Sequence, residues 1–218
     1  MGYSTISIPL DPGVRRHRLA ELKRLAGEHG LDLATRVDLA PEDRTSLLSA
    51  LRRLRRKFEL VGVLCTNKQV ARVAARDRRV DLLLFQLDPR RRYFDASEAE
   101  LASGSNCALE IDLMPIFRLP PRDRIRLLAR LRDEVALARR HGIPLVICSG
   151  ADEPVLMRKP RELAYLATVL GLGLEEALDS LSKIPLSLLE RNRAKLEPGF
   201  IAPGIRVVRP GRDPLGQG

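Results

Sequence analysis

The chain alternates between short apolar runs and longer amphipathic stretches from its start to about residue 171. The short runs are rich in branched apolar residues and suit buried strands, whereas the longer stretches repeat apolar residues at helical spacing. This pattern predicts strands at residues 3–8, 31–39, 60–66, 80–86, 107–113 and 144–149. It predicts helices between them, at residues 14–30, 41–58, 67–79, 97–103, 121–141 and 160–171.

The last part of the chain is predicted to be mostly helical. Two helices are expected at residues 173–182 and 186–196, with Pro185 between them. A seventh strand is expected at residues 205–208, and residues 210–218 have the composition of a flexible tail. Because no low-complexity linker interrupts the pattern, residues 1–209 are expected to form a single domain.

Strands that alternate with helices indicate an α/β protein in which parallel strands are joined by right-handed crossovers. Two architectures fit this pattern, a closed TIM-like barrel and an open, doubly wound sheet. An open nucleotide-binding sheet usually has a glycine-rich loop after its first strand, but here that loop, LDPGVRRH, holds a single glycine. Neither GxGxxG nor GxxxxGK[ST] occurs in the chain. The sequence therefore favours a TIM-like (β/α) barrel of parallel strands with additional C-terminal helices.

Charge adds a functional expectation. The 38 basic and 28 acidic residues give a net charge of +10, and 32 of the basic residues are arginines because only six are lysines. Such a balance favours a polyanionic partner, with nucleic acid first and an anionic membrane second. A G+C-rich genome or adaptation to heat would also enrich arginine, but neither explains the net charge. With no Trp and 4% aromatic residues, a base-stacking sheet is not expected.

The cysteines and the hydropathy pattern indicate where in the cell the protein is located. Cys65, Cys107 and Cys148 each lie in an apolar run, so we expect buried, reduced thiols of a cytoplasmic protein. No apolar run approaches the roughly 20 residues that a membrane span needs. The first ten residues, MGYSTISIPL, do not have the pattern of a secretion signal. A cytoplasmic protein without a membrane partner is therefore expected.

Two carboxylates in the segment CALEIDL are candidates for chemistry. The period of two places Glu110 and Asp112 on one face, which would point into a barrel near the carboxyl ends of its strands. One hypothesis is a metal-dependent phosphoesterase that uses these two residues with Asp11 and Asp152. The alternative is that the two carboxylates pair with interior Arg or Lys side chains.

The other residues offer little support for catalysis. None of the three histidines, His17, His29 and His141, is placed at the carboxyl end of a strand, and no HxH motif occurs. A site for several metal ions would have too few ligands, and no metal ligand is predicted on this chain. Ser149 follows a strand, but no histidine is placed to activate it.

Basic residues follow several predicted strands. In a barrel, runs after the third, fourth and sixth strands would all face the rim at the carboxyl ends. A further basic cluster lies near the end of helix 186–196. Clustering of this kind distinguishes a nucleic-acid surface from scattered solvated charge. The predicted RNA contacts are Lys68, Arg90, Arg91, Arg92, Arg158, Lys159, Arg161, Arg191 and Arg193.

The helix that starts at Pro160 would strengthen this surface. Lys159 precedes it, in place of the Ser, Thr, Asp or Asn that usually caps a helix. Free amides with cations around them would suit a phosphate. The alternative is that Glu162 partly caps the turn and the cations are merely solvated.

One segment resembles a known family. The stretch SGADEPVLMRKPRELAYLATVLGL, followed by SKIP and LLERNR, is similar to the closing half of archaeal ribonuclease P protein component 3. VGVLCTN and CALEIDL fit earlier strands of that family. The positions that carry the resemblance are Arg158, Pro160, Arg161, Glu162, Leu163, Gly171, Ser180 or Ser182, and Pro185.

The resemblance implies a fold and a function. The fold would be TIM-barrel-like, related to the phosphoesterases of the polymerase and histidinol phosphatase group but without their metal-binding histidines. The chain would be a subunit of an RNA-based endonuclease that removes the 5′ leader from precursor tRNA. The RNA would supply the active site with its own Mg²⁺, and this chain would carry no cofactor. It would stabilise that RNA together with component 2 and other protein subunits. Precursor tRNA would be an indirect partner, and the chain would not be catalytic alone. Arg158 would be the leading RNA contact, followed by Arg161 and residues 90–92.

Overall fold

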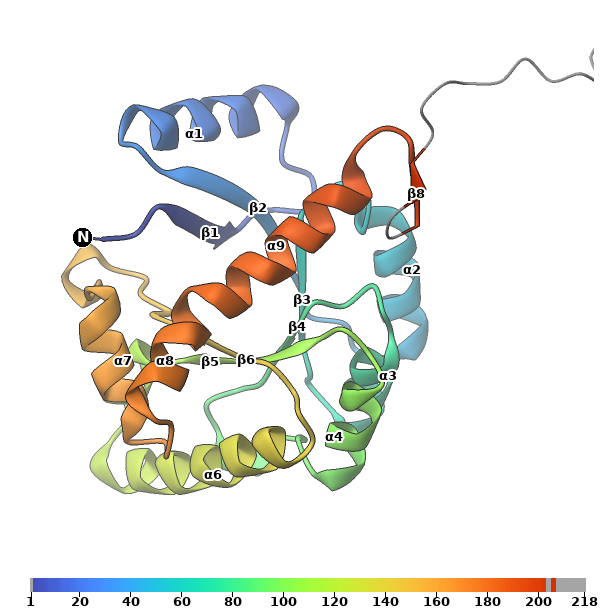
Figure 1. Cartoon of the computed structure of the whole chain (residues 1–218). Helices are drawn as coiled ribbons and strands as arrows, with labels where there is room; N and C mark the ends of the chain where they lie inside the picture. The colour runs from blue at the N-terminus through green and yellow to red at the C-terminus, as the bar shows by residue number, and fades with distance from the viewer. Residues whose placement is uncertain (1, 203–204, 207–218) are drawn as a thin grey trace, which may run out of the picture.

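The computed structural model describes residues 2–202 and 205–206 (Figure 1). Six parallel strands lie in one sheet in sequence order, β1-β2-β3-β4-β5-β6. A doubly wound sheet would reverse its strand order at a switch point, so the sequential order confirms the TIM-like arrangement. Within the described residues β1 pairs only with β2 and β6 only with β5, so the sheet is a curled half-barrel that remains open at one side. The strands are β1 Thr5–Pro9, β2 Asp32–Leu39, β3 Leu60–Leu64, β4 Leu82–Leu84, β5 Ala108–Asp112 and β6 Leu145–Cys148.

Helices follow most of the strands and cover the outer face of the sheet. The apolar stripes of these helices, except that of the first, form the main core with the outward-facing strand residues, such as Val37, Val63 and Leu109. The outer helices are α1 Arg16–Glu28, α2 Arg44–Leu54, α3 Lys68–Arg76, α4 Ala96–Ser103, α5 Met114–Phe117, α6 Pro121–Arg140, α7 Pro160–Thr168 and α8 Leu174–Leu181. Short 3₁₀ turns lie at η1 Pro89–Arg91 and η2 Pro154–Leu156. No helix in the described part of the chain has the length and apolar character needed to cross a bilayer.

The last helix, α9 Lys183–Leu196, lies on the concave side of the sheet and crosses it diagonally in Figure 1. Its Leu188 and Leu189, 5% and 2% exposed, pack against inward-facing residues of five strands. These strand residues are Ala34, Leu60, Leu82, Ala108 and Val146. The half-barrel is therefore filled by its own C-terminal helix, and this second, smaller core lies opposite the main one.

Some predicted boundaries are wrong for local reasons. Helix α2 begins at Arg44 rather than at residue 41, because the Asp43 carboxylate accepts a hydrogen bond from the Ser46 amide (2.8 Å) and caps the helix. Helix α9 begins before Pro185, which lies in its first turn, where a missing N–H costs nothing.

The predicted seventh strand does not extend the half-barrel. Ile205–Arg206 forms β8, which pairs antiparallel with β7 Phe200–Ala202 in a separate two-stranded sheet. Residues 207–208 of that prediction, and the predicted tail at 210–218, lie outside the described residues.

Candidate functional site

An ion pair crosses the concave side of the half-barrel near the carboxyl ends of its strands. Arg36 of β2 donates from both terminal nitrogens to the two carboxylate oxygens of Glu110 on β5, at 2.6 and 2.8 Å. The two residues are 6% and 4% exposed. This bidentate geometry is the strong form of the Arg–carboxylate interaction. The alternative in which an interior arginine pairs with the predicted acid is thus confirmed for Glu110.

Two glycines make room for this cluster. Arg36 also donates to Asp38 at 2.7 and 3.1 Å, and a Cβ on Gly62 would lie only 2.3 Å from an Asp38 carboxylate oxygen. Gly150 has φ +57°, and a Cβ there would lie 2.6 Å from the Cβ of Asp112. Larger residues at either position would therefore push a carboxylate out of place.

The cluster holds one cation among several acids. Burial raises the pKa of Glu110 to about 7; Arg36 opposes this shift, whereas Asp112 and Asp38 add to it. Burial also raises the pKa of Asp112. The Cys148 thiol has its pKa raised by burial and by the two nearby carboxylates, which keeps it protonated at neutral pH.

These residues do not fit a catalytic metal centre. Ligand atoms of Glu110, Asp112 and Cys148 lie within 4.8 Å of one another. However, both Glu110 oxygens are already bound by Arg36, and a protonated thiol is a poor ligand. Asp11 is exposed and accepts a hydrogen bond from the Gly13 amide (2.6 Å). The fourth acid of the phosphoesterase hypothesis, Asp152, is exposed and pairs with Arg118 at 2.5 Å. Across the described residues, no group of potential ligands includes a histidine.

The basic residue after β3 contacts the segment that follows β4. The Lys68 ammonium lies 2.7 Å from the Asp95 carboxylate, which joins the start of α3 to the segment that follows η1. Arg90 and Arg91 of η1 are exposed, and Arg91 has only a weak pair with Asp88 at 4.0 Å. Lys68, Arg90 and Arg91 therefore leave donors accessible at this edge.

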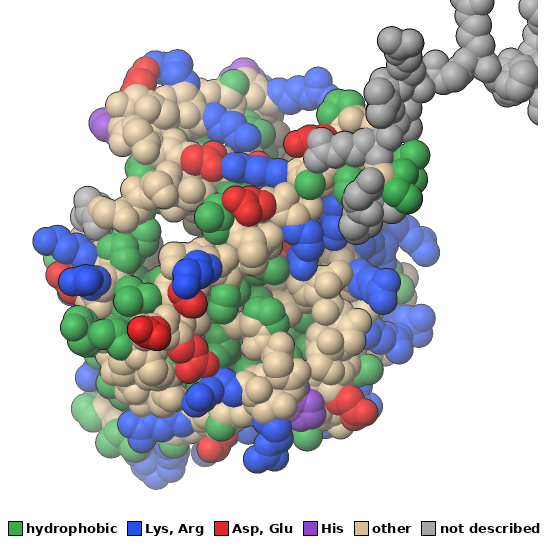
Figure 2. Space-filling view, viewed as in Figure 1, with side chains coloured by type: hydrophobic (Ala, Val, Ile, Leu, Met, Phe, Trp, Pro, Cys, Tyr) green, Lys and Arg blue, Asp and Glu red, His purple; other side chains and the backbone are tan. Residues whose placement is uncertain are grey.

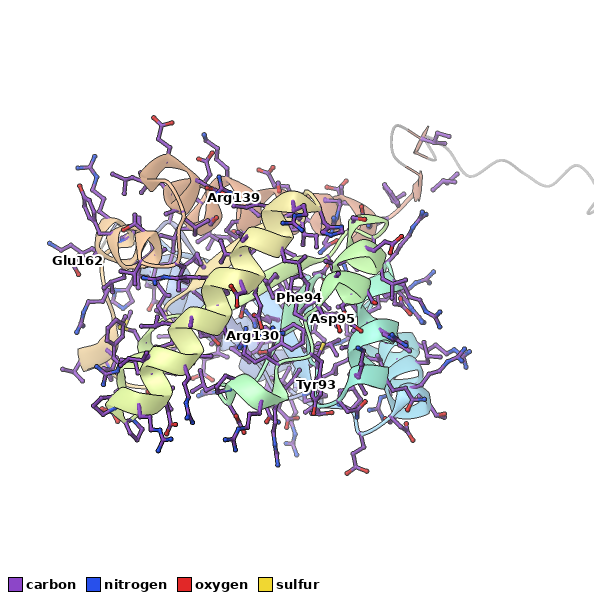
Figure 3. All side chains as sticks on the ribbon, turned by 90° about the horizontal axis from the view of Figure 1, so that it is seen from below. Tyr93, Phe94, Asp95, Arg130, Arg139 and Glu162 are labelled. Carbon is purple, nitrogen blue, oxygen red and sulfur yellow. The ribbon has the colours of Figure 1, made fainter. Side chains whose placement is uncertain are left out.

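Arg92 does not share this exposure, which corrects the prediction that it contacts RNA. It is 7% exposed, and its guanidinium binds the Glu134 carboxylate of α6 at 2.6 to 3.0 Å. Arg130, also on α6, donates to Glu134 at 3.1 Å and to the Phe94 carbonyl at 2.9 Å. Figure 3 shows Arg130 beside Phe94 and Asp95. Arg92 thus holds the η1 segment to α6 and has a structural role.

The turn before α7 lies elsewhere. The Tyr3 hydroxyl donates to the Arg158 carbonyl at 3.0 Å, and Tyr3 precedes β1. The turn follows the carboxyl end of β6 and also lies beside the residues that precede β1, so it is at the open side of the half-barrel. That all the basic runs share one rim stays a prediction. The Arg158 guanidinium donates to the carbonyls of Val155 (2.7 Å) and Met157 (3.0 Å) and is partly exposed.

The cations around the start of α7 remain accessible. Lys159 and Arg161 are both exposed. The Lys159 amide donates to the Glu162 carboxylate at 3.2 Å, so Glu162 partly caps the helix as the alternative proposed. Glu162 lies at the outer margin of the molecule in Figure 3. A phosphate at this helix start would therefore have to compete with a carboxylate.

The two predicted contacts on α9 bind carboxylates of the protein itself. Arg193 donates to both oxygens of Asp32 (2.7 and 2.9 Å) and to Glu59 (2.6 Å). Arg191 donates to Asp81 at 3.1 Å. Since these acids precede or begin β2, β3 and β4, both arginines fasten α9 across the amino ends of the strands. Arg191 and Arg193 therefore stabilise the fold, and their side chains remain 28% and 35% exposed, so the predicted RNA contact of these two residues stays a prediction.

Sequence reasoning did not single out Arg36. The signal was present, because the segment DLATRVDL of β2 alternates and places Ala34, Arg36 and Asp38 on the inward face. Buried carboxylates require a buried cation beside them, and an inward arginine opposite two inward acids supplies it.

Comparison with known proteins places the chain in a family. Residues 1–197 match the family model described as RNase P subunit p30. The chain belongs to this family, and the sequence resemblance is confirmed.

Among curated relatives, ribonuclease P protein component 3 of Methanosarcina acetivorans is 31% identical over 179 residues, covering 82% of this chain and 74% of the relative. The protein of the same name from Halorubrum lacusprofundi is 28% identical over 213 residues, covering 95% and 88%.

A solved structure shares the fold. A chain in the cryo-EM structure of archaeal ribonuclease P with mature tRNA superposes with a TM-score of 0.87 at 18% identity, covering 98% of this chain and 92% of that one. At this level of identity the likeness concerns the fold.

Proposed function

We propose that this chain is a protein subunit of ribonuclease P, the RNA-based endonuclease that removes the 5′ leader from precursor tRNA. The observation that carries this proposal is the match to the RNase P subunit p30 family over residues 1–197. The relatives named ribonuclease P protein component 3 support the same assignment. In this role the chain binds the catalytic RNA and stabilises its fold in the cytoplasm.

We further propose that the chain is not catalytic alone. The concave acidic cluster is neutralised in part by Arg36, which occupies both oxygens of Glu110. A phosphoesterase would need those oxygens for metal ions. Catalysis would then belong to the RNA and its Mg²⁺, and the protein would contribute phosphate contacts from exposed or partly exposed cations such as Arg90, Arg158 and Arg161.

Reconstitution tests both statements. Precursor-tRNA cleavage is measured in Mg²⁺ with ribonuclease P RNA and the other protein subunits, with and without this chain. We expect faster cleavage with the chain and none by the chain alone. Cleavage by the isolated chain, or turnover of a phosphomonoester in Mn²⁺, would show that it is catalytic. If cleavage is the same with and without the chain, the subunit assignment fails.

The predicted contacts have their own test. The triple variant Arg90→Ala, Arg158→Ala, Arg161→Ala should weaken binding of ribonuclease P RNA and lower its salt dependence by about one unit for each lost phosphate contact. The control is Lys183→Ala, which removes a cation paired with Asp179 at 2.8 Å. Equal affinity and equal salt dependence for the variant and the control would show that these three residues are not part of the RNA interface.

Component 2 is the protein partner that we propose. The segment around the Arg158 turn carries exposed apolar side chains, with Val155 71% and Tyr165 61% exposed, which a protein partner would cover. Val155→Glu with Tyr165→Glu should prevent co-purification of component 2 and leave RNA binding intact. If component 2 still co-purifies with this variant, it docks elsewhere.

A further inference from the structure

The positive charge of the chain is concentrated in one segment. Between Arg44 and Arg79 there are eleven basic and two acidic residues, a net charge of +9 in a chain whose total is +10. One of the two acids, Glu59, is 9% exposed and binds Arg193. The segment contains α2, β3 and α3, and β3 is buried, so this charge lies on the two helices and on the turns that follow them. Figure 2 shows Lys and Arg side chains gathered over the flank that α2 occupies in Figure 1.

A groove of about 340 Å³ lies between these helices. Its floor contains the apolar side chains of Leu48 and Val73, and three exposed arginines surround it. Charges beside apolar groups are less screened than charges surrounded by water, so an anion held there would interact strongly. The residues that line the groove are Arg44, Leu48, Val73, Arg76, Asp77 and Arg78.

The arginines that line the groove are not paired with a carboxylate among the described residues. No hydrogen bond or ion pair within 4.0 Å involves the side chains of Arg44, Arg76 or Arg78 in the part of the chain that the structure describes. The one acid of the groove, Asp77, is bound by Arg79 at 2.7 and 2.9 Å. Burial alone would raise the pKa of Asp77, but Arg79 and the nearby Arg76 lower it. Asp77 is therefore fully ionised and yet already paired.

The same surface continues along α2. Arg52, Arg53, Arg56 and Lys57 are exposed, and no acidic residue lies within α2. At its far end α9 adds Lys195, whose pKa is lowered by burial and then by the neighbouring Arg191 and Arg55. Asp81 pairs with both of these arginines and relieves part of the repulsion. Repulsion among the exposed cations of α2 is still a cost to the free protein, and a polyanion would reduce that cost.

We propose that the α2–α3 surface, defined as Arg44, Arg52, Arg53, Arg56, Lys57, Arg76 and Arg78, binds the phosphate backbone of double-helical RNA. The aromatic side chains on which single-stranded bases stack are missing here, since the one aromatic residue of segment 44–79, Phe58, is 2% exposed. Arginines that line a groove between two helices suit phosphates, which are recognised without reading the bases. The inference rests on the proposed function, because it assumes an RNA partner, but it assigns that partner to a surface outside the predicted contacts.

The test uses the full chain and a 16-base-pair RNA duplex, with binding measured by fluorescence anisotropy over a range of salt. The variant Arg44→Ala, Arg76→Ala, Arg78→Ala removes three charges from the groove. The matched control, Arg122→Ala, Arg126→Ala, Arg140→Ala, removes three exposed arginines from α6, so both proteins keep the same net charge. We expect the groove variant to lose about tenfold in affinity and about three units of salt dependence, and the control to lose less than twofold.

Three outcomes would overturn the inference. Equal losses in the two variants would mean that only net charge matters. A single-stranded RNA of 32 nucleotides that binds as tightly as the duplex would contradict the ligand class. Displacement of the duplex by poly-glutamate at equal charge concentration would indicate an acidic protein as the partner.

The proposed function can be judged separately. If the chain accelerates precursor-tRNA cleavage while the groove variant binds duplex normally, the function stands and the surface assignment fails. If the groove variant loses duplex binding while the chain has no effect on cleavage, the surface stands and the subunit assignment fails.

Discussion

Arginine has opposite roles in two regions of this molecule. Between η1 and α6, Arg92 is buried against Glu134, and its side chain is 4% exposed. On the α2–α3 surface, Arg44, Arg76 and Arg78 line a groove and have no carboxylate partner among the described residues. The buried Arg92 is paired with a carboxylate of the protein itself, whereas the groove arginines have charge that is available to a ligand. The presence of a partner carboxylate, rather than the residue type, therefore separates structural arginines from binding arginines.

The largest effect is expected where the buried arginines lose their partner. Glu134→Leu would leave Arg92 with no carboxylate in a buried position, and removal of one member of a buried pair costs about 3–5 kcal/mol. Urea denaturation should therefore show a large loss in the free energy of unfolding. The double variant Arg92→Met with Glu134→Leu should recover much of it. A single variant as stable as the wild type would show that Arg92 is not held by this pair.

A smaller loss is expected at the docking site of α9. Asn192 is fully buried and donates to the Glu59 carbonyl (2.9 Å) and to Asp81 (2.8 Å). Asn192→Ala removes the donor to the buried Glu59 carbonyl, whereas Asp81 keeps its hydrogen bond from Arg191, and loss of a partner at a buried acceptor costs about 1–3 kcal/mol. Thermal denaturation followed by circular dichroism measures the loss, with the exposed Glu190→Ala as control. An unchanged melting temperature would show that α9 is held by its leucines and arginines alone.

The concave cluster adds a dependence on pH. The pKa of Glu110 is about 7 in the folded protein against an ordinary value of 4.5, so the folded state binds the proton more tightly. This group therefore adds stability as the pH falls from about 7 towards 4.5, on the order of 1 kcal/mol for each unit of pKa difference. Carboxyls with a lowered pKa, such as Asp32, act in the opposite direction but only at lower pH.

The measurement is the free energy of unfolding between pH 7.5 and 5 for the wild type and Glu110→Gln. Glutamine does not ionise, so the variant should lack most of this slope. Asp112→Asn is a useful comparison, because the pKa of Asp112 is also raised by burial. Identical slopes for the wild type and Glu110→Gln would assign the pH dependence to other groups.

The smallest effect on stability is expected on the α2–α3 surface. Arg52→Ala and Arg53→Ala should each change the free energy of unfolding by less than about 0.5 kcal/mol, because exposed, unpaired side chains contribute little to folding. The same urea denaturation measures them beside Glu134→Leu. A decrease of more than about 1 kcal/mol in the free energy of unfolding of either variant would show that these exposed arginines also stabilise the fold.

Most of the fold could be predicted from the sequence, because β3, β4 and β6 are uninterrupted apolar runs, β2 and β5 alternate, and the outer helices have apolar stripes. The inward position of Glu110 followed from simple alternation. The burial of Arg92 could not be predicted in this way, since its partner Glu134 lies 42 residues away and the run RRR looks the same whether buried or exposed. The reach of the Arg158 turn to Tyr3 also depends on how far the sheet curls, which no local pattern encodes.

The position of α9 bears on how the chain is completed during synthesis. Domains fold as their residues leave the ribosome, from the N-terminus onwards. Here the last long helix covers the inner wall formed by Ala34, Leu60 and Val146, which belong to strands made much earlier. Until residues 183–196 have emerged, that wall lacks the cover of Leu188 and Leu189, and Asp81 has neither Arg191 nor Asn192. A nascent chain halted before Lys183 would therefore expose an apolar inner surface to which chaperones bind. Docking of α9, once it has been synthesised, would cover that surface.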